Sequence, residues 1–96
     1  MNNQEYASVE KSLLDKAKAI ADAKRPAYTL NSTDVLINFK DAGKKAGIEP
    51  MQAWSVHFQK HVDAILAYAK SSLIPQAEPI GERFADAINY LCLGYA

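Results

Sequence analysis

Apolar residues recur every three or four positions along most of the chain, the spacing that places side chains on one face of an α-helix. The pattern predicts four helices, over residues 4–24, from Ser32 or Thr33 to 46, from 50 to about 71, and over 78–96. No stretch alternates between apolar and polar residues for long enough to predict a strand. We therefore expect an all-α fold, with residues 1–96 forming a single domain.

Prolines and glycines set the predicted boundaries of these helices. The first helix should end before Pro26, because the residue preceding a proline is pushed out of the helical region. Gly47 should close the second helix as a left-handed C-terminal residue. Pro50 and Pro79 suit the first turn of the third and fourth helices, where a missing N–H costs nothing. The connecting segments are then residues 27–31, extended or turn, and the loop 71–78.

Each predicted helix has an apolar stripe that we expect to face the core. The four stripes are Tyr6, Val9, Leu13, Ala17, Ile20 and Ala21; Val35, Leu36, Phe39, Ala42 and Ala46; Met51, Trp54, Phe58, Val62, Ile65 and Ala69; and Phe84, Ala87, Ile88, Leu91 and Tyr95. Such stripes predict a compact four-helix bundle, which self-association into a homo-oligomer would complete.

The last helix carries a second, polar stripe opposite its apolar one. Glu82 and Asp86 lie four residues apart, where like charges repel by a few tenths of a kcal/mol. Asn89 and Leu93 continue the same face, which argues against a face that is simply solvated. This helix is therefore predicted both to pack on the core and to present a site.

Charge and cysteine content exclude several classes of partner. Eleven basic residues balance eleven acidic ones, so we expect neither direct binding to a DNA or RNA duplex nor attraction to an anionic membrane. The sequence has no apolar run of membrane-spanning length, and its start lacks the pattern of a signal peptide. These features are typical of a cytoplasmic protein. The single Cys92 is expected to be a buried thiol beside the core stripe.

The acidic stripe could hold a metal ion. Mg²⁺ prefers oxygen ligands and often takes one or two protein carboxylates, with phosphate oxygens and water completing its shell. Glu82 and Asp86 would supply such a pair from one rigid helix, with Asn89 one turn further on. The alternative is a solvated acidic face without a ligand, which is common on surface helices.

The third helix carries a basic edge beside its apolar stripe. His57 and His61 have the i, i+4 spacing of a two-histidine zinc site, but Lys60 between them disfavours a divalent cation. Lys60 and His61 suit a phosphate better, the first as a point charge and the second as a hydrogen-bond donor. The alternative is a half-buried histidine beside a lysine whose stem lies along apolar surface.

The loop 24–34, KRPAYTLNSTD, combines cations, an aromatic ring and hydroxyl groups just before a helix N-terminus, where anions are favoured. Tyr28 could stack on a nucleobase while Arg25 contacts a phosphate. The alternative is an ordinary polar loop.

Three segments carry a family resemblance: RPAYTLNSTDVLINF, HFQKHVDAIL and ERFADAINYLCLG. Over roughly residues 20–96, their order resembles the phage nucleotide-modification-associated domain 1 family. That family is itself similar to the all-α MazG-like nucleoside triphosphate pyrophosphohydrolases. The most specific segment is the last one, with an acid-x-x-x-Asp-x-x-x-Tyr pattern at Glu82, Asp86 and Tyr90.

The resemblance implies a nucleotide ligand, Mg²⁺ held by Glu82 and Asp86, and phosphate contact from Lys60. It also implies a homo-oligomer, dimer or tetramer, whose sites lie near subunit interfaces. The MazG-like enzymes have a Glu-x-x-Glu pair on an earlier helix, and this chain contains no such pair. Its carboxylates suffice for one Mg²⁺ rather than for two-metal hydrolysis.

Three functional hypotheses follow. In a Mg²⁺-dependent hydrolase of nucleoside triphosphates, Asp34 or His61 would be catalytic and position the attacking water. In a non-catalytic binder, the ligand-binding groups would be Arg25, Tyr28, Lys60, His61 and Asn89. Such a binder could sequester a cyclic-type immune signalling nucleotide in a phage host's cytoplasm. The third hypothesis is a structural helical module that dimerises through its apolar C-terminal sequence LCLGYA.

Overall fold

The computed structural model describes residues 1–30, 32–71 and 79–96. It contains four α-helices: α1 Asn3–Thr29, α2 Ile37–Ala46, α3 Pro50–Lys70 and α4 Ile80–Tyr95. Within those described ranges no residue is in a strand. The predicted all-α class with four helices is therefore confirmed.

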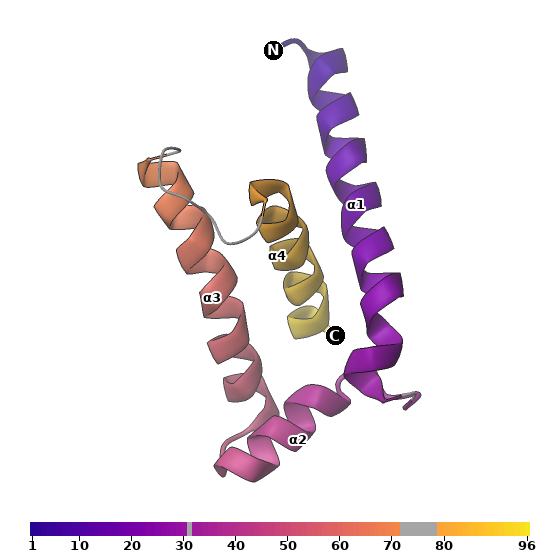
Figure 1. Cartoon of the computed structure of the whole chain (residues 1–96), viewed down its shortest axis with the longest axis vertical. Helices are drawn as coiled ribbons and strands as arrows, with labels where there is room; N and C mark the ends of the chain where they lie inside the picture. Colours follow the sequence, from indigo (N-terminus) through magenta and orange to yellow (C-terminus); the bar gives the residue numbers. More distant parts are fainter. Residues whose placement is uncertain (31, 72–78) are drawn as a thin grey trace.

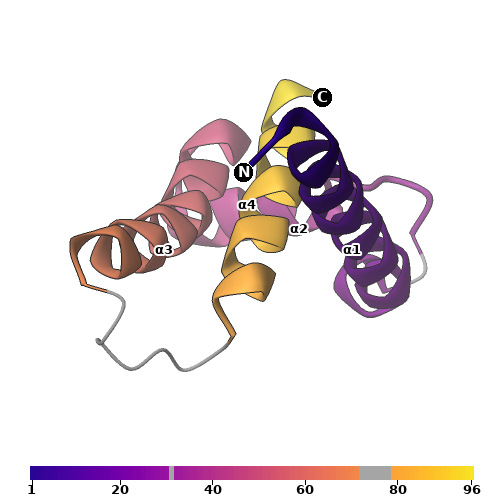
Figure 2. The ribbon, with the colours of Figure 1, turned by 90° about the horizontal axis from the view of Figure 1, so that it is seen from above.

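Helix α4 is the central element of the fold. It lies between α1 and α3 in both views (Figures 1 and 2) and packs against each of them. Helix α2 crosses one end of this layer, where it packs on α3 and touches α1. Among the described residues, no Cα atom of α1 comes within 8 Å of one in α3. Helix α4 therefore connects α1 to α3.

Helix α1 continues through Pro26, so the prediction that it ends there is wrong. A proline inside a helix removes its own N–H bond to the carbonyl four residues earlier, and its ring crowds that carbonyl, so other contacts must offset the cost. The following turn is held by the hydroxyl of buried Thr29, which donates to the carbonyl of Arg25 at 2.8 Å. The helix ends at Leu30, whose left-handed backbone (φ 51°) lets its N–H bond the carbonyl of Pro26.

Helix α2 begins at Ile37, four or five residues after the predicted cap at Thr33 or Ser32. The hydroxyl of Ser32 accepts the N–H of Asp34 at 3.1 Å, and a carboxylate oxygen of Asp34 accepts the N–H of Leu36 at 3.0 Å. These local turns compete with helical hydrogen bonds and delay the helix.

The other predicted ends agree closely with the structure. Gly47 ends α2 in the left-handed conformation (φ 72°), and Pro50 opens α3. Pro79 immediately precedes α4, at its N-terminal cap position. The predicted loop 71–78 includes Ser71, which ends α3, while its other residues lie outside the described ranges.

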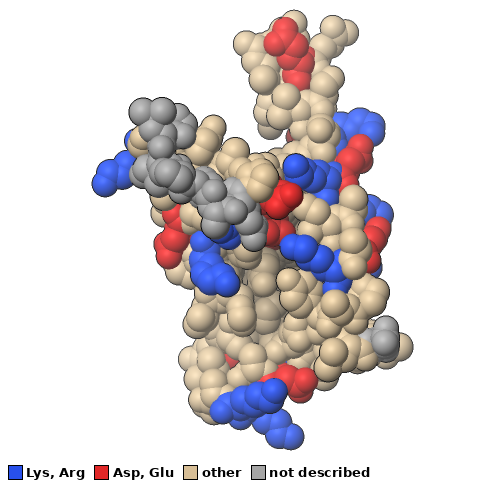
Figure 3. Space-filling model, viewed as in Figure 1, with Lys and Arg blue, Asp and Glu red and all other residues tan. Residues whose placement is uncertain are grey.

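Small residues form most of the buried core. Ala17 and Phe39 are buried as predicted, together with Ala53 and Ala85. Several residues expected to face the core are instead exposed: Tyr6, Val9, Val35, Ala46, Met51 and Ala69. On α1 the reason is visible in Figures 1 and 3, where its N-terminal half projects beyond the other helices. Every residue from 1 to 12 is exposed.

The predicted orientation of α4 is wrong. The apolar stripe points outward, with Phe84 38%, Leu91 54% and Tyr95 96% exposed. Towards α1, the side-chain amide of Asn89 donates to the carbonyl of Ala17 at 2.9 Å. Periodicity identifies which residues share a stripe, but only the neighbouring helices determine which stripe they cover. Cys92 is also exposed rather than buried.

The chain is more extended than the compact bundle that we expected. Its radius of gyration is 15.1 Å, whereas about 12.5 Å is typical of a globular chain of this length. Its principal extents are 46 × 27 × 21 Å. Among the described residues, no helix is both long and apolar enough to cross a bilayer.

Candidate functional site: a cavity between four helices

All four helices contribute to one cavity of about 720 Å³. Sites for small molecules and cofactors usually have volumes of ~300–1,000 Å³ and combine apolar walls with a few polar groups. Apolar walls come from Ile20 and Ala21 of α1, Ala42 of α2 and Leu93 of α4. The cavity therefore has the dimensions and wall character of a ligand site within a single chain.

Cationic groups outnumber carboxylates around this cavity. The cations are Lys24, Arg25, Lys45 and Lys60, while the only carboxylates in the lining described are those of Asp41 and Asp86. The chain as a whole has no net charge, so this excess of positive charge is local. Because a cleft focuses the potential of its lining charges, the cavity favours an anion.

Aromatic rings run along one side of the cavity. The ring centroid of Phe39 lies 6.1 Å from that of His57 and 6.1 Å from that of Tyr90. The Tyr90 ring lies 4.8 Å from the ring of His61, tilted by 37°. These rings and Tyr28 provide flat surfaces on which a heteroaromatic ligand could stack.

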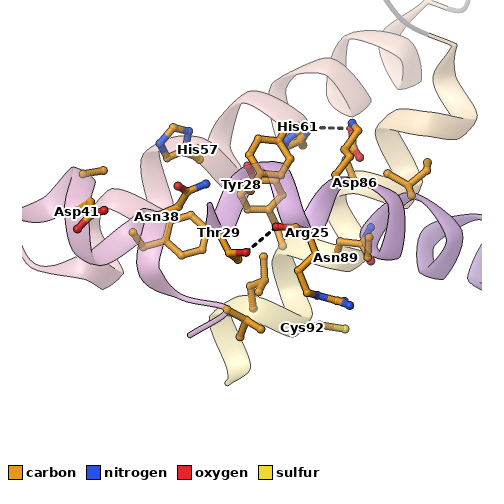
Figure 4. Close-up of a pocket in the computed structure, with 18 of the residues that line it drawn as sticks. Arg25, Tyr28, Thr29, Asn38, Asp41, His57, His61, Asp86, Asn89 and Cys92 are labelled. Carbon is orange, nitrogen blue, oxygen red and sulfur yellow. Dashed lines mark hydrogen bonds and ion pairs between the residues drawn. The ribbon is translucent and has the colours of Figure 1, made fainter. Parts of the chain in front are cut away.

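His61 of α3 and Asp86 of α4 face each other across the inner part of the cavity (Figure 4). Nδ1 of His61 lies 3.9 Å from a carboxylate oxygen of Asp86, and both side chains are largely buried. This distance exceeds that of a hydrogen bond, so the contact is an ion pair whenever His61 is protonated. The pair links α3 to α4 at the point where the polar stripe of α4 meets the cavity.

A second contact from α3 holds the backbone of Tyr90 in place. The indole N–H of Trp54 donates to the backbone carbonyl of Tyr90 at 2.7 Å. Burial raises the pKa of the Tyr90 phenol, and the neighbouring Tyr28 and Asp86 raise it further. Tyr90 therefore remains a neutral hydrogen-bonding group well above neutral pH.

The structure brings together most of the residues predicted for the site. The predicted ligand-binding residues Arg25, Tyr28, Lys60, His61 and Asn89 all line the cavity, as does the predicted metal ligand Asp86. They come from three helices, and Figure 4 shows Tyr28, His61 and Asp86 around the same space. Arg25 also bonds Asp22 through Nη1 at 3.1 Å, an exposed pair that a ligand could displace.

Two predicted residues do not line the cavity. Glu82 lies one helical turn before Asp86 on the same face of α4 but is not part of the lining. Asp34 occupies the turn before α2, where its carboxylate accepts hydrogen bonds from Lys40 at 2.6 Å and from the N–H of Leu36. These hydrogen bonds hold the pKa of Asp34 below its usual value, so the carboxylate already has a structural role.

Sequence reasoning missed the contribution of α2. Asn38, Asp41 and Lys45 line the cavity with spacings of three and four residues, which place them on one face of the helix. This polar face was visible in the sequence beside the apolar one that includes Phe39. This face lines the cavity because α2 lies across the end of the α1–α4–α3 layer, a position that the sequence alone does not give.

The predictions of a metal site gain no support from the donor set of the described residues. Among the described residues, no group of three or more His, Cys, Asp or Glu side chains is arranged to hold a metal ion. His57 and His61 both line the cavity, and no third protein ligand accompanies them within the described part of the chain.

No protein-family model matches this chain, and neither does any curated protein or solved structure. The resemblance to a nucleotide-related phage family therefore remains a prediction from three short segments. Any functional conclusion depends on the chemistry of the cavity.

Proposed function

We propose that the cavity binds a nucleotide or nucleoside polyphosphate. The observation that carries the proposal is the combination of aromatic rings and excess cations around one space of suitable volume. A nucleotide joins a flat heteroaromatic base to an anionic phosphate chain, and both parts would find complementary groups there. The proposal rests on the lining residues of a single chain.

In this proposal, Lys60 and Arg25 bind phosphate and the aromatic side chains hold the base. Lys60 is exposed and lines the cavity as a point charge, whereas Arg25 offers a planar fork that matches a phosphate. Tyr28 of α1 lines the cavity together with the ring pair of His61 and Tyr90, and a base could stack on these rings. Asn89 and Asn38 would then read polar edges of the ligand.

Mg²⁺ would accompany the phosphate chain rather than form a site with the protein alone. Asp86, with Glu82 one turn earlier, would supply one or two carboxylate ligands, and phosphate oxygens would supply others. The Asp86 carboxylate alone would repel a phosphate group, and the ion would neutralise this repulsion. Asp34, the other carboxylate that we predicted for the site, is engaged by Lys40 and Leu36 and is not part of the described cavity lining.

This donor set favours binding over hydrolysis. Two-metal hydrolysis needs several carboxylates to hold both ions and orient the attacking water. A protein that binds without turnover could sequester a signalling nucleotide, including a cyclic one, and this is the second candidate function. The alternative is a Mg²⁺-dependent pyrophosphohydrolase. Analysis of the nucleotide products distinguishes the two functions.

Thermal unfolding with a panel of nucleotides, with and without Mg²⁺, tests the proposal. A ligand at ~100 times its dissociation constant adds ~2.7 kcal/mol to the free energy of unfolding, which shifts Tm by several degrees. Chromatography of the same mixtures separates the two functions, because a hydrolase releases cleaved product whereas a binder returns the nucleotide intact. If no nucleotide in a broad panel stabilises the protein, the proposal is wrong.

The variant K60A, with K44A as its matched control, locates the binding site. Both lysines are exposed, but only Lys60 lines the cavity. A lost charge-assisted hydrogen bond costs ~1.5–3 kcal/mol, so K60A should weaken nucleotide binding at least ~10-fold. Binding to K44A should be unchanged. Equal weakening in both variants would indicate non-specific attraction to surface charge.

A further inference from the structure

Helix α2 presents to the cavity a polar face that makes no contact of its own with the rest of the protein. Asn38, Asp41 and Lys45 line the cavity at spacings of three and four residues, so they lie along one face of the helix. All three are exposed. Within the described chain, none of the three side chains takes part in a hydrogen bond or an ion pair. Their donors and acceptors are therefore open to a ligand.

Asp41 differs in this respect from every other aspartate of the chain. Asp15, Asp22, Asp34 and Asp63 each accept a side-chain hydrogen bond, and Asp86 lies 3.9 Å from Nδ1 of His61. The Asp41 carboxylate has no such partner among the described residues, although Lys45 is only one turn away on the same helix. A carboxylate whose oxygens are uncommitted selects what can lie beside it, because it accepts hydrogen bonds and cannot donate them.

The two carboxylates of the cavity lining lie at different ends of the space (Figure 4). Asp41 lies on α2 and Asp86 on α4, and Tyr28 lies between them in this view. The ring centroid of Tyr90 is 6.1 Å from that of Phe39 in α2. A base stacked on Tyr28 and Tyr90 would therefore turn one edge towards α2.

The Asp41 carboxylate restricts the chemistry of that edge. It repels phosphate oxygens, carbonyl oxygens and unprotonated ring nitrogens, and it attracts N–H groups. Guanine presents two adjacent donors, N1–H and the N2 amino group, which match the two oxygens of one carboxylate. Adenine and cytosine each place an acceptor beside their amino group, and uracil flanks its single N–H with two carbonyls. Of these four bases, only guanine can satisfy both carboxylate oxygens along this edge.

We propose that the cavity selects guanine nucleotides, with the Asp41 carboxylate accepting hydrogen bonds from N1–H and the N2 amino group of the base. Asn38 and Lys45 lie one turn to either side of Asp41 and supply donors for O6, the acceptor beside N1–H. This inference rests on the nucleotide-binding function proposed above and adds the identity of the base. Asp41 is then a specificity-determining residue that does not contact the phosphates.

Calorimetric titration of the full chain with GTP, ITP and ATP, each with Mg²⁺, tests the inference. ITP keeps O6 and N1–H but lacks the N2 amino group, so it isolates one of the two proposed hydrogen bonds. A hydrogen bond to a charged group corresponds to about 10–100-fold in affinity. GTP should therefore bind at least ~10-fold more tightly than ITP or ATP.

The variant D41N, with D63N as its matched control, assigns this preference to Asp41. The substitution keeps the shape of the side chain but puts an N–H₂ donor in place of one carboxylate oxygen. In D41N the preference for GTP should fall to about 2-fold or less. Asp63 is also exposed but lies outside the cavity lining, so D63N should keep the wild-type preference. Both substitutions are on the surface, where stability changes little, and circular dichroism checks the fold.

Equal affinities for the three nucleotides in the wild type would overturn the guanine assignment and leave the nucleotide-binding proposal standing. A D41N variant that keeps its full preference for GTP would also overturn the assignment. If D41N weakens all three nucleotides equally, the carboxylate contacts the ribose that they share, and Asp41 does not recognise the base. Absence of binding by all three nucleotides and by the broader panel would overturn the proposed function itself.

Discussion

The indole ring of Trp54 lies directly against Gly94, and its N–H donates to the carbonyl of Tyr90 one turn earlier. A Cβ atom on Gly94 would lie only 2.4 Å from Cζ2 of Trp54 and 2.6 Å from Cε2. The ring is also stacked on Phe58, with centroids 5.0 Å apart, so it has little room to move. Gly94 therefore sets how closely α3 approaches α4.

The substitution G94A should destabilise the protein. Alanine favours a helix by ~1 kcal/mol over glycine, but overpacking against a rigid ring typically costs ~1–3 kcal/mol. The clash should dominate, with a net loss of about 1 kcal/mol in the free energy of unfolding, measured by urea titration.

The same substitution should have the opposite effect once the ring is removed. In a W54A background, G94A no longer meets an aromatic ring, and its helix propensity should make it stabilising by up to ~1 kcal/mol. A comparison of the four variants gives the coupling between residues 54 and 94. If G94A has the same effect in both backgrounds, the close contact does not limit the approach of the helices.

Replacement of Leu30 by glycine should stabilise the protein. Leu30 ends α1 with φ 51° and is 83% exposed, so it bears the cost of a left-handed backbone while burying little surface. A residue with a Cβ pays ~1–2 kcal/mol in that conformation, and glycine pays almost none. We expect L30G to gain about 0.5–1 kcal/mol in urea unfolding, after the greater freedom of glycine in the unfolded chain is subtracted.

L30A separates backbone strain from the loss of the leucine side chain. Alanine removes most of the side chain but keeps the Cβ atom, so L30A should show no gain. A stabilised L30A together with an unchanged L30G would mean that the left-handed conformation is not the source of the strain.

The stability of the protein should fall in alkaline solution because of Tyr90. Its pKa is raised in the folded state, mainly by burial, from an ordinary value of 10.0. Below pH 10 both folded and unfolded states hold the proton, so the contribution to stability is complete. As pH rises further, the unfolded chain loses its proton first and unfolding becomes easier.

Urea unfolding between pH 8 and 11.5 checks this dependence, with Y90F and Y6F as a matched pair. Y90F removes the buried phenol and should show a shallower alkaline loss of stability than the wild type. Y6F removes an exposed phenol at the projecting end of α1 and should follow the wild-type curve. If the stability of Y90F and that of the wild type depend on pH in the same way, Tyr90 is not the source of the alkaline loss of stability.

The existence and ends of the helices were largely predictable because they depend on local chemistry. Gly47 and Pro50 act through their own backbone preferences and occupy their predicted positions. Pro26 was misread because contacts made by the next turn, including the buried Thr29, outweigh the preference of the preceding residue. The start of α2 was misread because the side chains of Ser32 and Asp34 form turns of their own.

The face that each helix turns towards its neighbours was harder to predict than the position of the helix in the sequence. The stripe of α4 that includes Phe84 and Leu91 has the composition of a core face, yet α1 and α3 cover the opposite side. Close helix contacts occur where small residues such as Ala85 lie, and a hydrophobic stripe does not reveal these positions. Most of the residues predicted for the site line the cavity despite this error, because they were selected for their polar chemistry and not for the orientation of α4. The α2 contribution from Asn38 and Lys45 required the tertiary arrangement.

The projecting end of α1 divides the molecule into regions that differ in local stability. Residues 1–12 are exposed throughout, so their helical turns are supported mainly by their own backbone hydrogen bonds, which are marginal in a short segment. Their amide hydrogens should exchange with solvent far sooner than those around Ala17, which is packed against α4. Opening of this end leaves the cavity lining intact, because the lining contributed by α1 begins only at Ile20. A ligand in the cavity therefore need not order the first turns of α1, and the entropy of that segment does not oppose binding.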